Sequence, residues 1–150
     1  MGQSLSRVYL HIIFGTKNWE PSIQPAIENE LYSYLAGVCH HLDCATLSVN
    51  GHLNHVHILS RLSKTITIAE LLQKLKSNSS KWMKTKDEDI KHFSWQDGYA
   101  AFSVSESALA SVSQYINQQK EHHKIIGYKD EIRNLLRENG IEIDEKYFWR

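Results

Sequence analysis

The chain has 150 residues and a formal net charge of zero, because 17 lysines and arginines balance 17 aspartates and glutamates. This balance argues against a protein that coats nucleic acid through electrostatics alone. No apolar run approaches the roughly 20 residues of a membrane span, so we expect one soluble domain over residues 1–150. The two cysteines, Cys39 and Cys44, match no usual zinc motif, which favours free thiols and a reducing, cytoplasmic compartment.

The first half of the chain predicts three strands and one helix. β-Branched and aromatic residues over 8–14 indicate a buried strand, and apolar residues at helical spacing predict a helix over about 26–42. A second strand is expected over 45–49. Asn50-Gly51 is a strong hairpin signal, so the third strand should run over about 53–62.

In the second half, Thr65 or Thr67 can cap a helix that ends by about Lys84. The remaining elements are expected to be extended segments over 93–95 and 99–104, a helix over about 106–124 and a short helix over 129–138. The order strand, helix, strand, strand, helix, strand is the split β-α-β pattern. We therefore expect a ferredoxin-like α+β fold: an antiparallel sheet with helices on one face, a central third strand and an added C-terminal helix.

His55 and His57 lie two residues apart on the predicted third strand. Both side chains therefore point to one face and can reach one metal ion, whereas Val56 points the other way. Tyr115 and Gln119 are four residues apart and share a face of the predicted helix. The alternative is that these residues are purely structural. The chain has nine histidines, so His55 and His57 could simply have their hydrogen bonds satisfied within the fold, and Tyr115 could cap the core.

Together these groups would suit phosphodiester chemistry. Two imidazoles and an amide oxygen would hold Mg²⁺ or Mn²⁺, with Zn²⁺ as another candidate, and the ion would polarise the scissile phosphate. Tyr115 would attack as a nucleophile and hold the phosphate covalently. A free 3′-hydroxyl could later rejoin the strands without ATP.

Lysines crowd the stretch over residues 64–91, where acidic residues oppose only some of them. Such a stretch is either a solvated helix face or a surface that contacts phosphates. In the second interpretation Lys76, Lys81 and Lys84 would neutralise phosphates. Trp82 would stack on unpaired bases, or it would belong to the core.

Several segments resemble the HUH single-tyrosine transposases of small bacterial insertion sequences, including their repeat-associated domesticated relatives. The similar segments are residues 4–17, 75–82 and 95–104, together with Tyr115-Ile116 followed by Gln119, Glu121, His122 and His123. The combination spans nearly the whole chain and is far more specific than His-x-His alone. The added C-terminal helix would then be the catalytic helix.

This resemblance implies a metal-dependent enzyme that recognises hairpins in single-stranded DNA. His55 and His57 match the histidines of the motif, Gln119 the third ligand, and Tyr115 the nucleophile that becomes linked to a 5′-phosphate. A homodimer with composite active sites is also implied, and no membrane partner. Asn54 departs from the aspartate common in the family, which puts the support of the ligands in question.

Two alternatives remain open at this stage. One is a domesticated nickase that acts on chromosomal repeats. The other is a binding module for single-stranded nucleic acid that keeps the sheet and lacks the reaction.

Overall fold

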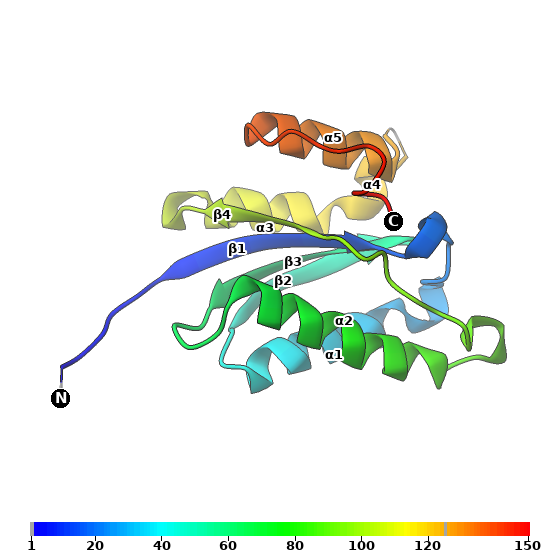
Figure 1. Ribbon diagram of the computed structural model, residues 1–150, viewed down its shortest axis with the longest axis horizontal. Coiled ribbons are helices and arrows are strands. Elements are labelled where there is room, and N and C mark those ends of the chain that lie inside the picture. Colours follow the sequence, from blue (N-terminus) through cyan, green and yellow to red (C-terminus); the bar gives the residue numbers. More distant parts are fainter. Residues whose placement is uncertain (1, 125) are drawn as a thin grey trace.

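The computed structural model describes residues 2–124 and 126–150, and its centre is a four-stranded antiparallel sheet (Figure 1). The strands are β1 (Val8–Gly15), β2 (Thr46–His52), β3 (His55–Leu62) and β4 (Ala100–Val104). Their order is β2-β3-β1-β4, so β3 is central and pairs with both β1 and β2. The predicted ferredoxin-like α+β fold is confirmed.

Helices cover both faces of this sheet (Figure 1). One layer contains α1 (Pro25–His41) and α2 (Ile68–Lys84), and the opposite layer contains α3 (Leu109–Asn117), α4 (Gln119–His122) and α5 (Tyr128–Glu138). Three short 3₁₀ turns complete the described elements: η1 (Lys17–Trp19), η2 (Glu88–Ile90) and η3 (Glu106–Ala108). Thr67 caps α2, since its hydroxyl accepts a hydrogen bond from the Glu70 amide at 3.1 Å.

Alternation along the strands divides the interior into two apolar clusters. Toward α1 and α2 point Ile12, Val56 and Ile58, which are fully buried. Toward α5 point Ile13 and Phe102, packed with other buried residues of that layer, which include Ile132 and Leu136. The second cluster is smaller and gives way to polar side chains along β3.

The predicted hairpin turn at Asn50-Gly51 is wrong. Both residues lie inside β2, where Gly51 pairs with Val56, and the turn falls at Leu53-Asn54. A Cβ atom on Gly51 would lie 2.2 Å from the backbone oxygen of His55. The glycine is therefore required by the close approach of the two strands and not by a turn conformation.

The predicted continuous helix over 106–124 is broken at Gln118. In an unbroken helix the carbonyl of Ile116 would accept a hydrogen bond from the amide of residue 120. Here the Asn50 side chain of β2 donates to that carbonyl at 3.0 Å, and Ser48 donates to the Asn117 side chain at 2.8 Å. Side chains of β2 thus hydrogen-bond to the C-terminal end of α3, and the helix ends there.

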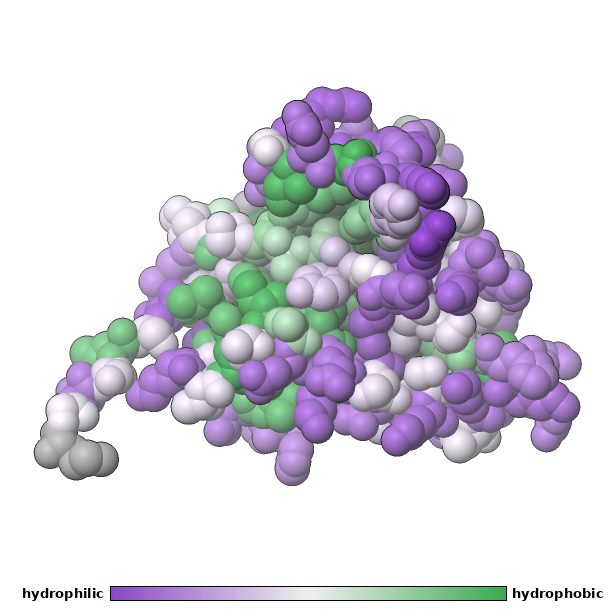
Figure 2. Space-filling model, viewed as in Figure 1, coloured by the Kyte–Doolittle hydropathy of each residue, from purple (hydrophilic) through white to green (hydrophobic). Residues whose placement is uncertain are grey.

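The extended segment predicted over 93–95 is only an isolated bridge between Thr16 and Trp95. Cys39 and Cys44 are buried and free, as expected, and burial raises the pKa of the Cys39 thiol to about 11. Within the described ranges, none of the helices has the length and apolar character to cross a membrane. Figure 2 shows apolar side chains gathered on the surface beside β4, between α2 and α5. Residues of this region line a hollow of about 580 Å³.

Candidate metal centre and tyrosine site

His55 and His57 lie fully buried on the face of β3 that α3, α4 and α5 cover. Their Nδ1 atoms are held by neighbours that can accept a hydrogen bond. Asn54 Oδ1 lies 2.9 Å from Nδ1 of His55, and Nε2 of the buried His11 lies 2.8 Å from Nδ1 of His57. When Nδ1 carries the proton in this way, Nε2 of each ring keeps a free lone pair. Asn54 therefore performs the supporting role that its departure from aspartate had put in question.

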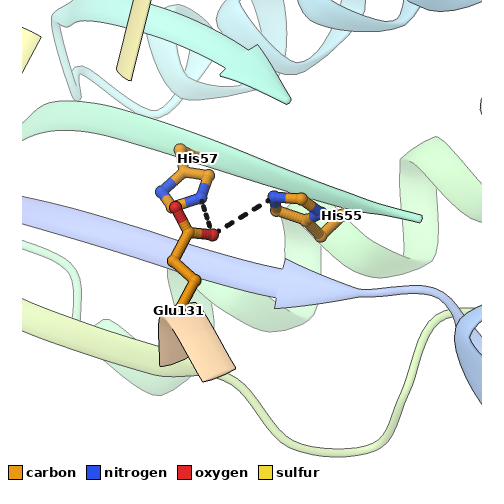
Figure 3. A group of neighbouring side chains, drawn as sticks. All are labelled: His55, His57 and Glu131. Atoms are coloured by element: carbon orange, nitrogen blue, oxygen red, sulfur yellow. Dashed lines mark hydrogen bonds and ion pairs between the residues drawn. The ribbon is translucent and has the colours of Figure 1, made fainter. Parts of the chain in front are cut away.

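The two Nε2 atoms point at a carboxylate that the sequence did not single out. Oε1 of Glu131, on α5, lies 3.4 Å from Nε2 of His55 and 3.2 Å from Nε2 of His57 (Figure 3). One ligand atom from each of these three buried residues lies within 4.8 Å of the others. Two imidazoles and a carboxylate form a donor set that divalent metals use.

Gln119 and Tyr115 contact the other oxygen of the same carboxylate. Gln119 is fully buried, its Nε2 donates to Oε2 of Glu131 at 3.0 Å, and its Oε1 lies 3.0 Å from Nε2 of His55. The hydroxyl of Tyr115 also donates to Oε2 of Glu131. All four residues predicted for catalysis and metal binding thus meet in one place, although α3 and α4 are separate helices.

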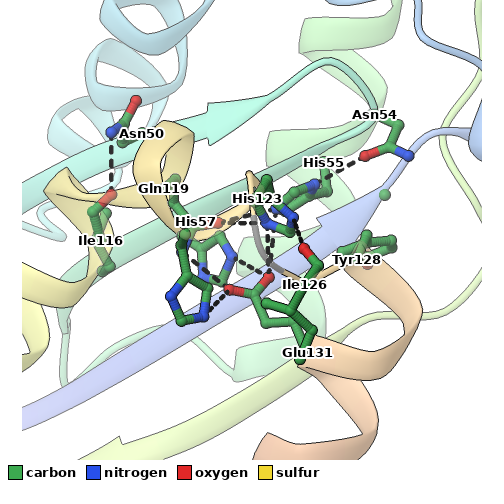
Figure 4. A network of polar contacts seen from close by, with 12 residues as sticks. Asn50, Asn54, His55, His57, Ile116, Gln119, His123, Ile126, Tyr128 and Glu131 are labelled. Carbon is green, nitrogen blue, oxygen red and sulfur yellow. Dashed lines mark hydrogen bonds and ion pairs between the residues drawn. The ribbon is translucent and has the colours of Figure 1, made fainter.

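Two further side chains close the site (Figure 4). His123, at the end of α4, places Nε2 3.2 Å from Oε1 of Glu131. Tyr128 stacks on the ring of His55 with centroids 4.3 Å apart, and its hydroxyl donates to Oε1 of Gln96 at 3.1 Å. The stacked ring covers the His55 imidazole on the side of α5.

Burial and charge set the protonation of this cluster. Burial lowers the pKa of His55 to about 4 and, together with the neighbouring His57, that of His11 to about 3, so both rings are neutral at pH 7. Burial opposes ionisation of Glu131, but hydrogen bonds from His123, His55 and His57, when a proton is shared at Nε2, outweigh it and hold its pKa well below the usual range. Burial and then the charge of Glu131 raise the pKa of Tyr115, which keeps its hydroxyl protonated.

These residues fit a metal ion on the chemistry of their donors. The neighbours recorded for Oε1 of Glu131 among the described residues are imidazole nitrogens, and imidazoles held through Nδ1–H face it with lone pairs. Lone pairs and an anionic oxygen repel one another unless a cation or shared protons lie between them. A divalent cation satisfies the whole set at once.

The lysine-rich stretch lies in the other layer, on α2. Lys76 is engaged with the carbonyls of Asp97 and Gly98 at 2.9 and 3.0 Å, and burial lowers its pKa to about 8. Lys81 and Lys84 are exposed. Trp82 is half-buried and stacks on Tyr34 at 5.2 Å, with Lys86 over its face. The sheet separates these residues from the histidines, so contact with DNA through them stays a prediction.

Comparison with known proteins agrees with this arrangement. Residues 4–119 match the family described as transposase IS200 like. The chain belongs to the IS200-like transposases. Two solved structures share the fold. A candidate transposase from Deinococcus radiodurans R1 has a TM-score of 0.65 and 22% identity, covering 79% of this chain and 96% of that one. A REP-associated tyrosine transposase bound to a REP hairpin has a TM-score of 0.61 and 11% identity, covering 84% of this chain and 76% of that one. No curated protein matches the chain significantly.

Two residues of this IS200-like transposase had no site role assigned from the sequence, although His123 lies in the similar segment named above, and both lie beyond the matched segment. Glu131 and His123 follow residue 119, the last position that the family matches. Glu131 did carry a signal, because it lies among the apolar positions Tyr128, Ile132 and Leu136 of α5. A carboxylate on the buried stripe of a helix needs a partner, which is a reason to expect a site there.

Proposed function

We propose that this chain is a metal-dependent single-stranded DNA transposase that cleaves its substrate through a 5′-phosphotyrosine intermediate at Tyr115 and later rejoins the strands. One observation carries the proposal. The Tyr115 hydroxyl, the Gln119 amide and the Nε2 atoms of His55 and His57 all meet at Glu131, within a single chain. A nucleophile and a metal-binding set that share one carboxylate are arranged for phosphoryl transfer.

The cleavage step follows from these contacts. The Tyr115 oxygen attacks the phosphorus, the new O–P bond forms, and the bond from phosphorus to the 3′ oxygen of the preceding nucleotide breaks. The departing oxygen takes a proton from water and leaves as a 3′-hydroxyl. Oε2 of Glu131 already accepts the hydrogen bond of the Tyr115 hydroxyl and is the acceptor for the phenolic proton. Attack by a 3′-hydroxyl on the phosphotyrosine reverses these bond changes and joins strands.

The metal ion would be held by His55, His57, Oε1 of Glu131 and the Gln119 amide. When bound, it would polarise the phosphate and neutralise charge on its oxygens. A cation would also assist Tyr115, since burial and then the negative charge of Glu131 raise the pKa of this tyrosine. A carboxylate whose charge is offset opposes phenolate formation less. The expectation from the sequence was Mg²⁺ or Mn²⁺, and Mn²⁺ suits both the nitrogen and the oxygen donors of this set.

Hairpin recognition is supported by fold similarity. The REP-associated tyrosine transposase that shares this fold is bound to a REP hairpin. We therefore propose hairpin-containing single-stranded DNA as the substrate class. A mobile element and a domesticated nickase would share this chemistry, whereas a silent binding module has no need for the convergence of Tyr115 and Gln119 on Glu131.

A homodimer remains a prediction. It is supported by the apolar surface beside the edge strand β4, because exposed apolar patches of this kind mark contact surfaces. Tyr115 contacts Glu131 of its own chain, which favours an active site completed in cis. Mixing Tyr115→Phe with His57→Ala protein tests this, since composite sites would restore cleavage and sites completed in cis would not.

The proposed function is tested with 3′-labelled single-stranded DNA taken from the hairpin-forming sequence beside the gene. With Mn²⁺ present, wild-type protein should give a labelled band of protein size on a denaturing gel, and Tyr115→Phe should give none. Tyr147→Phe is the matched control, because Tyr147 is 54% exposed and outside the site. An adduct of Tyr115→Phe at the wild-type level would refute the nucleophile.

A further inference from the structure

His123 has the placement of a metal ligand, although it lies outside the two-histidine motif and beyond residues 4–119, which the family matches, and the resemblance assigns it no role. Its side chain is only 4% exposed. Its Nε2 lies 3.2 Å from Oε1 of Glu131 and 3.0 Å from Oε1 of Gln119. The ring centroid lies 4.5 Å from that of His55, with the planes at 68°. His123 therefore faces the same point as the motif histidines.

The orientation of the ring follows from a single hydrogen bond. Nδ1 of His123 lies 2.8 Å from the carbonyl oxygen of Ile126, and a carbonyl can only accept. Nδ1 must carry the proton, so in the neutral ring Nε2 presents its lone pair to Glu131. A backbone carbonyl on the distal nitrogen is the usual support of a metal-binding histidine. The rings of His55 and His57 are held in the same manner, by Asn54 and His11.

The net charge of the buried site distinguishes a bound metal ion from a set of protonated imidazole rings. If His55, His57 and His123 each donated a proton from Nε2 while keeping the proton on Nδ1, three positive charges would surround the single negative charge of Glu131 in a buried space, or two if His11 donates to Nδ1 of His57. Uncompensated buried charge of that size is strongly unfavourable. One divalent cation replaces three protons, accepts all three lone pairs and leaves a net charge of one.

We propose that His123 is a third imidazole ligand, so that the site is a three-histidine, one-carboxylate centre with the Gln119 amide beside it. The inference rests on the proposed function and adds a ligand and a selectivity to it. Imidazole nitrogens favour first-row transition ions, whereas Mg²⁺ prefers an oxygen shell. The centre should therefore take Co²⁺, Zn²⁺ or Mn²⁺ in preference to Mg²⁺.

The test measures Co²⁺ binding to the full chain without DNA, by calorimetry and by visible absorption, which reports the ligands directly. His123→Asn is the informative variant, because its amide can still donate to the Ile126 carbonyl but offers no imidazole. We expect its Co²⁺ affinity to fall at least about tenfold and its absorption bands to shift. A tenfold excess of Mg²⁺ over Co²⁺ should leave the wild-type spectrum unchanged. His40→Ala, at an exposed position at the end of α1, should bind as wild type does.

The outcomes separate this inference from the proposed function. Wild-type affinity and an unchanged spectrum for His123→Asn, with binding lost in His57→Ala, would overturn the third ligand and leave the motif centre intact. Absence of Co²⁺ binding by the wild type would overturn both. Circular dichroism establishes that each variant is folded, and His123→Gln, which keeps a polar side chain of similar length, replaces His123→Asn if that variant unfolds.

Discussion

The two faces of the sheet use the same strand in opposite ways. On β3, Val56 and Ile58 point into the apolar cluster beneath α1 and α2, whereas His55 and His57 point toward α5 and meet a carboxylate. All four side chains are fully buried. One face is filled by the larger apolar cluster, and the other combines a smaller apolar cluster with polar groups whose repulsion a cation or shared protons would relieve. The candidate site lies on the face that has the smaller apolar cluster.

The largest effect is expected from the polar face. His57→Ala should lower phosphotyrosine formation by about a thousandfold or more, because metal ions supply several kcal/mol of transition-state stabilisation. The labelled-adduct gel measures this, with DNA binding assayed in parallel. His41→Ala, exposed at the end of α1, is the control. Cleavage by His57→Ala at the wild-type level would show that the polar face of the sheet is not required for the reaction.

The neighbouring position should show the opposite behaviour. Ile58→Ala should reduce the free energy of unfolding by about 2–5 kcal/mol, since it opens a cavity in a packed core. It should retain Co²⁺ binding at temperatures where it stays folded. Denaturant unfolding gives the free energy, and Leu47→Ala, at a position 43% exposed on β2, should change it by less than about 0.5 kcal/mol. An equal loss in the free energy of unfolding for Ile58→Ala and Leu47→Ala would contradict the assignment of stability to this core.

Acid should destabilise the metal-free protein through the polar face. The folded chain holds His11 and His55 neutral, with pKa values of about 3 and about 4, whereas the unfolded chain protonates both below about pH 6.5. Unfolding therefore takes up protons between about pH 6.5 and 4, and stability falls as the pH falls through this window. Glu131 adds a loss below its ordinary pKa of 4.5. Melting temperatures from pH 7.5 to 5 measure the trend, and a flat profile would show that the rings are already charged in the fold.

The smallest effect is expected on α2, in the layer away from the tyrosine. Lys81→Ala with Lys84→Ala should weaken hairpin binding and reduce the slope of log affinity against log salt by about two, if both side chains contact phosphates. Binding titrations at several salt concentrations measure the slope. Lys74→Ala with Lys64→Ala provides a charge-matched control. An unchanged slope would confine DNA to the polar side of the sheet.

Local signals were sufficient for much of the fold. The helix that Thr67 caps was predictable, because the cap and the apolar spacing act within a few residues. The shared orientation of the candidate metal-binding pair on β3 was predictable for the same reason, since the strand period alone aligns His55 and His57. These parts of the sequence specify their structure without distant partners.

Other features depend on contacts between distant segments. The break at Gln118 arises because Asn50 of β2 captures the Ile116 carbonyl, a pairing separated by 66 positions. Strand pairing placed Asn50-Gly51 within β2, although the dipeptide alone favours a turn. The contacts of Glu131 with the histidines could not be predicted, because they form only when α5 packs over β3. The helical spacing indicates that Glu131 lies on the buried face of α5, but it does not predict which residues Glu131 contacts.

The glycine at position 51 determines which substitutions the site tolerates. It is not among the candidate site residues, yet an added Cβ atom would lie 2.2 Å from the backbone oxygen of His55. Because that oxygen is part of the hairpin, relieving the clash would displace the segment from which the His55 imidazole extends. Saturation mutagenesis should therefore record position 51 as intolerant as the ligands themselves, for a reason that concerns space and not chemistry.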